Sequence, residues 1–339
     1  MVTTENLYII GNGFDLYHGL ATSYVNFAYF LRENYEDIYE MYTHYFALPD
    51  VDLDDPQNPK IWMWNEFERR LSSFMADEII EDNWDLADGP SAPDFKYAGL
   101  MTFSIEMEKK VDLLIKDMPE AFREFVISRK LPALPVSKEL EFKAKSLYLN
   151  FNYTDTLERY YNLNHRRILY IHGEASRVDS EIILGHGVAP ERLYKREEPL
   201  TAPEGMDYEE YEAWCEIQSN KRDPSTDDAI ATLQTYYHKS HKPTKTILKE
   251  YREFFWQLRD VKAVYVLGHS MAEVDLPYFG KVAKSVKMSQ VDWFVSYYAD
   301  EEQKRHWETL AKLGVPEEKI HLFRLPEMVR KVPELFDRI

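Results

Sequence analysis

The chain of 339 residues is long for a single hydrophobic core, so we expect one large domain with insertions, or two domains. It carries 59 acidic and 41 basic residues, and the net charge of −18 argues against nonspecific binding to nucleic acids or anionic membranes. Its one cysteine, Cys215, excludes an intramolecular disulfide and a multi-cysteine zinc ribbon. With no signal-peptide core and no long apolar run, the sequence predicts a soluble, cytoplasmic protein without a membrane partner.

The first predicted strand leads directly into a glycine-rich turn. Residues 7–10 form an apolar run typical of a buried parallel strand, Gly11-Asn12-Gly13 follows, and a helical pattern opens near Thr22. Glycines permit a sharp turn and let a ligand approach backbone N–H groups, and a following helix favours an anion such as pyrophosphate. A tight turn without a ligand is the alternative, because the full dinucleotide fingerprint has a third glycine.

Apolar periodicity along the rest of the chain predicts an α/β fold with a mainly parallel, Rossmann-like sheet flanked by helices. We expect a single domain over residues 1–339, with a helical insertion at 46–140 and a second, acidic insertion at 190–245. The further strands are predicted at residues 146–151, 167–171, 181–184, 261–267, 291–296 and 319–324. The helices are predicted at residues 24–45, 61–83, 99–129 (interrupted near Pro119), 246–259, 277–286 and 301–313, with turn-rich breaks at 50–60 and 85–98.

Four of these predicted strands end in a turn that contains glycine. The turns are Gly11-Asn12-Gly13, His172-Gly173, Gly185-His186-Gly187 and Gly268-His269-Ser270, and they hold six of the 12 glycines. Ligands of open parallel sheets bind beyond the carboxyl ends of the strands, so these turns are expected to converge on one crevice.

Three histidines lie in these turns: His172, His186 and His269. A histidine at a pocket mouth can remove a proton from a hydroxyl group, whereas a buried one can simply be satisfied by neighbouring backbone. Both interpretations stay open for His186 and His269. A metal site made of all three is disfavoured, since no matching His or carboxylate spacing accompanies them, and no metal is expected.

The ordered motifs carry a resemblance to a known family. They are Gly11-Asn-Gly-Phe-Asp-Leu followed by His18-Gly-Leu-x-Thr-x-Tyr, Trp64-Asn-Glu-Phe-Glu68, Phe151-Asn-Tyr-Thr-Asp155, Ile171-His-Gly173, and Leu267-Gly-His-Ser270 with Asp275. The series resembles the AbiH family of bacteriophage abortive-infection proteins over residues 7 to 280. More distantly, the motif order is similar to that of the sirtuin-like NAD-binding superfamily.

The resemblance implies a site that binds NAD and cleaves its bond to nicotinamide. Asn152 matches the asparagine that sirtuin-like enzymes use near the nicotinamide ribose, and His172 matches their base on a ribose hydroxyl. The transition state is oxocarbenium-like, so the protein must hold the ribose and place water or an acceptor. The residues implied in ligand binding are Gly11, Asn12, Gly13, Phe14, Asp15, His18, Asp155, Gly268, His269, Ser270 and Asp275.

The sequence also departs from the sirtuin-like pattern. Asp15 stands where sirtuins usually carry serine; it could bind a ribose hydroxyl, cap the helix or indicate another ligand. The zinc ribbon is missing. The run from Asn152 to Asp155 also has one residue more before the aspartate than the sirtuin-like motif has. Trp64 and Phe67 are expected in the core, and Glu68 on a helix surface or in an ion pair.

These observations predict an antiphage effector that hydrolyses NAD or a related nucleotide. A non-catalytic sensor of ADP-ribose or another nucleotide, signalling to a partner, is the alternative. A homo-oligomer and a phage-derived trigger are possible partners. A nucleic-acid enzyme fits poorly with the acidic charge and with the lack of a clustered carboxylate motif.

Overall fold

The computed structural model describes residues 4–51, 60–86, 97–194, 202–203, 205–221 and 224–329. Contacts group the chain into two compact units. The sheet unit comprises residues 1–27, 122–183 and 243–339, and the helical unit comprises residues 28–121 and 184–242. Most of both expected insertions therefore lies in the helical unit, while a single domain with two insertions stays a prediction.

The sheet unit is built on six parallel strands in the order β3-β2-β1-β4-β5-β6. The strands are β1 (Asn6–Ile10), β2 (Ser146–Asn150), β3 (Ile168–Tyr170), β4 (Ala263–Leu267), β5 (Asp292–Ser296) and β6 (Ile320–Phe323). This arrangement confirms the predicted α/β fold. Ile10 pairs with Asn150 on one side and with Leu267 on the other, so the segments after β1, β2 and β4 leave the sheet at the same edge.

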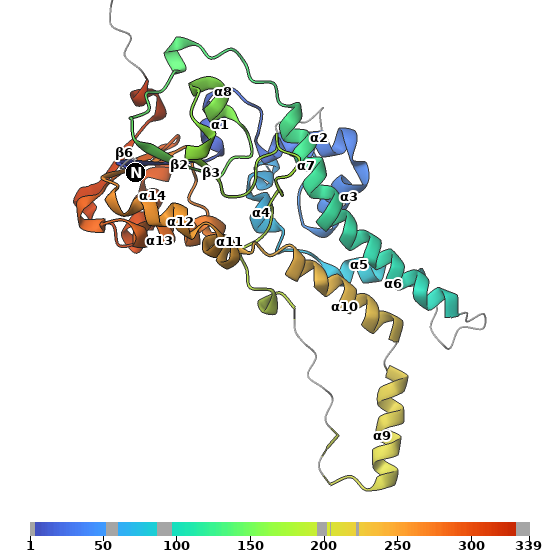
Figure 1. Ribbon diagram of the computed structural model, residues 1–339. Coiled ribbons are helices and arrows are strands. Elements are labelled where there is room, and N and C mark those ends of the chain that lie inside the picture. The colour runs from blue at the N-terminus through green and yellow to red at the C-terminus, as the bar shows by residue number, and fades with distance from the viewer. Residues whose placement is uncertain are drawn as a thin grey trace, which may run out of the picture. The chain divides into compact units, whose positions relative to one another are not determined.

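Helices cover both faces of this sheet (Figure 1). Leu7 and Ile9 pack on one face with apolar residues of α11 (Thr244–Glu250), α12 (Arg252–Trp256), α13 (Leu276–Ser285) and α14 (Asp300–Lys312). Tyr8 and Ile10 pack on the other face with α1 (Asn12–Tyr17) and α8 (Thr156–Tyr161). Because both faces are buried, β1 is continuously apolar from Leu7 to Ile10 rather than alternating.

In the sheet unit, one predicted strand is wrong and one helix was not predicted. Residues 181–184 form no strand; Ile183 instead donates its N–H to His172 O at 2.9 Å, and the Tyr153 hydroxyl donates to Ile183 O at 3.1 Å. The helix expected to open near Thr22 begins at Tyr24, and the sequence did not predict the short helix α1 before it, which buries Phe14 directly after the turn.

The helical unit contains α3 (Glu36–Tyr45), α4 (Phe67–Arg70), α5 (Ala76–Asp82), α6 (Tyr97–Asp112), α9 (Tyr208–Lys221) and α10 (Pro224–Lys239). A break at Tyr35 separates α3 from α2 (Tyr24–Asn34), where one helix over 24–45 was predicted. A π-helical turn at Leu113–Asp117 joins α6 to α7 (Met118–Ser128), which confirms an interruption near Pro119. The predicted breaks at 50–60 and 85–98 lie largely outside the described residues.

Within this unit, Trp64 and Phe67 are fully buried, as predicted. The Glu68 carboxylate pairs with the Lys242 ammonium at 2.8 Å, which confirms its expected place in an ion pair. The residues predicted as one helix over 61–83 form three shorter pieces, the first a 3-10 segment at Ile61–Glu66.

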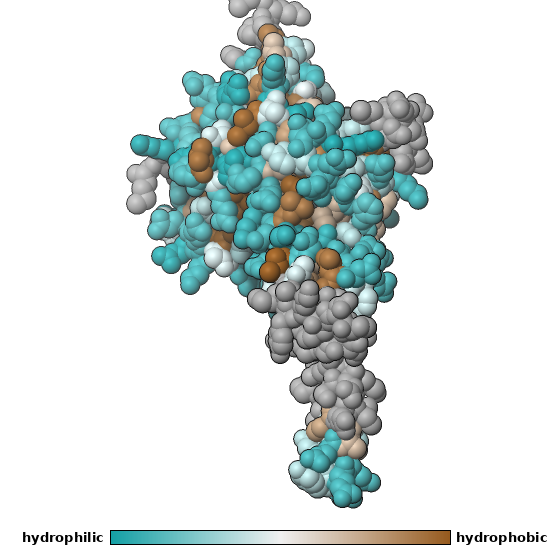
Figure 2. All heavy atoms as spheres, turned by 90° about the vertical axis from the view of Figure 1, so that its right-hand side faces the viewer, coloured by the Kyte–Doolittle hydropathy of each residue, from teal (hydrophilic) through white to brown (hydrophobic). Residues whose placement is uncertain are grey.

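Hydrophilic side chains cover most of the face drawn in Figure 2, with hydrophobic residues in scattered spots. Among the described helices, none has both the length and the apolar character that crossing a bilayer would require.

Candidate functional site

The turns after β1 and β4 pack backbone against backbone, and this contact explains their glycines. A Cβ on Gly13 would lie 2.8 Å from Gly268 O, and one on Gly11 would lie 2.6 Å from the Cα of His269. Gly268 has a φ of +62°, and a Cβ there would lie 2.1 Å from the Phe14 nitrogen. Side chains at these positions would therefore force the two strand ends apart.

The same contact engages two of the N–H groups that the sequence offers to a phosphate. Gly11 donates to Leu267 O at 3.0 Å, and Gly13 donates to Gly268 O at 2.8 Å. The Gly268 N–H in turn donates to the Ser296 hydroxyl at 2.8 Å. A ligand over this turn would have to be recognised mainly by side chains around it.

Three residues of the first motif make well-defined contacts within the protein. Asn12 and Thr22 exchange two hydrogen bonds, from Asn12 Nδ2 to Thr22 O at 3.0 Å and from Thr22 Oγ1 to Asn12 Oδ1 at 2.7 Å. Phe14 is fully buried in the core. His18 Nδ1 donates to Phe14 O at 2.7 Å, so its Nε2 accepts from the Tyr161 hydroxyl at 2.6 Å. Burial lowers the pKa of His18, which favours the neutral ring.

Asp15 lies beneath the turn rather than on its surface. Its side chain is 1% exposed, and the Thr154 hydroxyl donates to its Oδ2 at 2.6 Å. Burial raises the pKa of this carboxyl to about 6, although hydrogen bonds from Thr154, Thr156 and Asn152 oppose the shift. Asp15 therefore does not point at a ligand lying over the turn.

Asn152 joins the segment after β2 to the turn after β1. Its Nδ2 donates to Gly11 O at 3.1 Å, and its backbone N–H donates to the Asn150 side chain at 3.1 Å. Because a carbonyl oxygen only accepts, the nitrogen end of the amide must face Gly11. The amide oxygen is then the end that can accept a hydrogen bond from a ligand.

A buried carboxylate lies between two histidines at the same edge of the sheet. Asp275, the residue before α13, has Oδ1 3.8 Å from His172 Nε2 and Oδ2 3.7 Å from His269 Nε2. His269 Nδ1 accepts the Met271 N–H at 2.9 Å, so its Nε2 carries the proton in the neutral ring and faces Asp275. Phe151 follows β2, and its ring centroid lies 5.3 Å from the ring centroid of His172 and 4.4 Å from that of His269. The structure thus brings residues after β2, β3 and β4 together.

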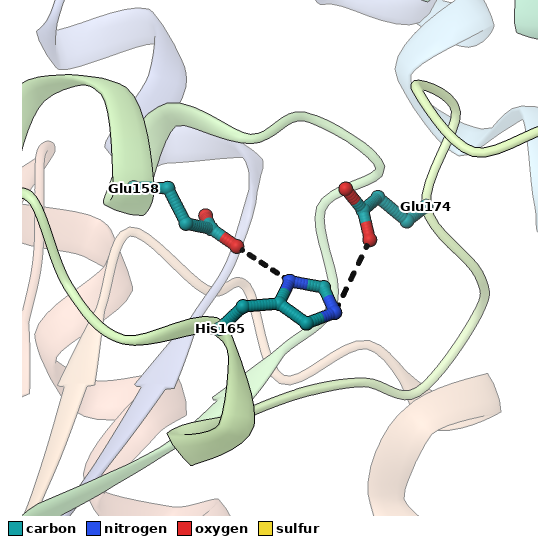
Figure 3. A group of neighbouring side chains, drawn as sticks. All are labelled: Glu158, His165 and Glu174. Carbon is teal, nitrogen blue, oxygen red and sulfur yellow. Dashed lines mark hydrogen bonds and ion pairs between the residues drawn. The ribbon is translucent and has the colours of Figure 1, made fainter.

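A second polar cluster holds the segments on either side of β3 (Figure 3). His165 Nδ1 lies 3.0 Å from Glu158 Oε1, and its Nε2 lies 3.8 Å from Glu174 Oε2. These groups are close enough to offer a metal ion three ligands. However, Arg177 donates to His165 Nε2 at 3.2 Å and Tyr170 donates to Glu158 at 2.6 Å, so hydrogen bonds account for the cluster. It ties α8 to the turn that carries His172.

The motifs that form these contacts coincide with a family signature. A family model described as Bacteriophage abortive infection AbiH matches residues 7–297. The chain belongs to the AbiH family. Comparison with curated proteins and with solved structures finds no match. Family membership indicates a role in bacteriophage abortive infection.

Other candidates of this AbiH-family chain lie at the margin of the site or in the other unit. Asp155 precedes α8 without a side-chain cap bond and pairs with Arg159 at 3.7 Å, and Ser270 is exposed. His186 belongs to the helical unit, where it is fully buried; burial and, secondarily, His241 lower its pKa to about 4, so it is neutral at pH 7. Of the three histidines predicted at strand ends, His172 and His269 share a carboxylate.

Sequence reasoning missed the hydroxyl groups of this site. The Thr154 hydroxyl donates a hydrogen bond to Asp15, and the Thr156 hydroxyl donates to Thr154 at 3.0 Å. The Ser296 hydroxyl accepts the Gly268 N–H. The run Asn152-Tyr-Thr-Asp-Thr156 directly after a buried strand was an available signal, because polar residues at carboxyl strand ends gather at one edge.

Proposed function

We propose that this protein is an abortive-infection effector that binds NAD at the carboxyl edge of its sheet and hydrolyses the bond between nicotinamide and ribose. The strand order carries the proposal. In doubly wound sheets of this order, dinucleotides bind where the order reverses, which here lies between β1 and β4. The Gly11–Gly13 and Gly268–Ser270 turns flank that point.

The residues near this point suit the chemistry. His172 would accept the proton of a ribose hydroxyl, and the Asp275 carboxylate, 3.8 Å from its Nε2, would stabilise the resulting imidazolium. The Asn152 amide oxygen would accept from a ribose hydroxyl or from water. Water adds to the ribose carbon as the bond to nicotinamide breaks, which yields ADP-ribose, nicotinamide and a proton.

The test uses purified full-length protein and NAD, with and without phage lysate as a trigger, and follows nicotinamide by chromatography. Asn152→Ala and His172→Ala should lower nicotinamide release by about 100-fold or more and abolish phage protection while they retain a folded melting transition. His321→Ala is the matched control, because this histidine lies in the edge strand β6 and bonds Asp292 at the amino end of β5, so both readouts should stay unchanged. If nicotinamide never appears and both variants still protect, NAD hydrolysis is refuted.

A sensor that binds a nucleotide without cleaving it is the second candidate. It is favoured by the burial of His172, which is 3% exposed, and by the structural bond of Asn152 to Gly11. ADP-ribose or NAD would then raise the melting temperature and be recovered unchanged.

A further inference from the structure

We propose that Asp15 is a positioning residue that orients the Asn152 amide, so that the two residues act as one unit beneath the glycine turn. This inference rests on the proposed function of Asn152 at the ribose. It reassigns Asp15, which the sequence had placed among the ligand-binding residues.

The position of Asp15 is the first support. A side chain that is 1% exposed cannot contact a ligand lying over the turn without rearrangement. Its Oδ2 is already bonded by Thr154, whose hydroxyl is itself bonded by Thr156. This chain of hydroxyl groups fixes the carboxylate in place.

The orientation of Asn152 is the second support. One Nδ2 proton goes to Gly11 O at 3.1 Å, and the amide also interacts with the Asp15 carboxyl. Asp15 Oδ1 is buried, and no group among the described residues bonds it with good hydrogen-bond geometry, so the second Nδ2 proton of Asn152 is the donor that can serve it. With acceptors on its nitrogen side, the amide can turn only its oxygen toward a ligand.

A carboxylate suits this task better than an amide does. An ionised aspartate accepts hydrogen bonds at both oxygens, so it can serve Thr154 and Asn152 together. Asparagine at position 15 has only one acceptor atom, so either Thr154 or Asn152 would face an NH2 group. The Asp15→Asn substitution therefore keeps the shape of the side chain at position 15 but no longer fixes the orientation of the Asn152 amide.

The deciding measurement is the side-chain NH2 resonance of Asn152 in full-length protein labelled with 15N-asparagine, assigned by its loss in Asn152→Ala. In the wild type, its protons should exchange with water at least about tenfold more slowly than those of exposed asparagines. Asp15→Asn should shift the resonance and remove most of this protection. The control Asp292→Asn, which alters a carboxylate bonded to His321 at the amino end of β5, should leave it unchanged.

Two results would overturn the inference. One is an Asn152 resonance that Asp15→Asn does not move. The other, which needs no variant to fold, is a wild-type Asn152 amide that exchanges as fast as the exposed ones.

Kinetics separate positioning from direct ligand contact. If NAD is cleaved, Asn152→Ala should lower kcat by about 100-fold and Asp15→Asn by about 10-fold, with KM nearly constant, and the double variant should be no slower than Asn152→Ala alone. A rise in KM with an unchanged kcat would place Asp15 on the ligand and contradict the proposal. If no NAD is cleaved, the proposed function fails, while the resonance of Asn152 still decides the inference.

Discussion

Replacing Gly268 with alanine tests the backbone contact on which the strand-end geometry depends. The added Cβ would lie 2.1 Å from the Phe14 nitrogen and 2.4 Å from the Gly13 carbonyl carbon, both backbone atoms that cannot rotate away. A left-handed alanine costs about 1 kcal/mol, and overpacking a rigid site adds about 1–3 kcal/mol. We therefore expect Gly268→Ala to lower the free energy of unfolding by about 2–4 kcal/mol.

Gly314 supplies the matched control for this experiment. Its φ of +87° also favours glycine, but nothing lies within 4 Å of a Cβ placed there. Gly314→Ala should cost only the conformational part, about 1 kcal/mol. Urea unfolding followed by tryptophan fluorescence compares the two variants. Equal losses for both would refute the argument that the turns after β1 and β4 require glycine by contact.

Two further predictions concern buried charges. The pKa of Asp15, about 6, lies above its unfolded value of 3.8, so its contribution to stability is present below pH 3.8 and is lost as the pH rises through 6. Relative to Asp15→Asn, the wild type should lose about 2 kcal/mol of unfolding free energy between pH 4 and pH 7, measured by urea unfolding. Parallel curves for the two proteins would contradict this prediction. Lys242→Met removes the fully buried cation that pairs with the partly buried Glu68 carboxylate, so it should destabilise the protein by about 2–3 kcal/mol. Lys145→Met, at an exposed pair with Glu5, should change the melting temperature little.

The strands were predictable because continuous apolar runs mark strands that are buried on both faces. Residues 181–184 show the limit of this signal. Glu-Ile-Ile-Leu is a similar apolar run, but hydrogen bonds of Ile183 with His172 and Tyr153 hold it outside the sheet. Hydrophobicity identifies a buried segment; which neighbour supplies its hydrogen bonds is decided by tertiary contacts. The helix α1 was missed for a related reason, because Gly11-Asn-Gly13 is typical of a turn and the helix there buries Phe14 and Asp15 in tertiary contacts.

The sequence could predict that the site lies at the carboxyl edge of the sheet, but not how its side chains are arranged. Parallel strands place their carboxyl ends together, so the sequence could group the residues after β1, β2, β3 and β4. It could not show that Asp275, more than a hundred residues after His172, would lie between that histidine and His269. Nor could it show that Asp15 faces inward, because the direction of a side chain depends on how α1 rotates against β1.

The glycines of the first turn are weaker evidence for a ligand than their sequence suggests, because their contact with Gly268 already requires them. The better evidence is the burial of titratable groups at this edge. Asp15, His172, His269 and Asp275 are each at most 8% exposed, although burying such groups costs free energy unless they are well paired. At the amino edge, Glu5 is partly exposed and pairs with exposed Lys145, as surface charges commonly do. A sheet that needed only stability could do without buried titratable groups at either edge, so these groups are what favour a chemical role for the carboxyl edge.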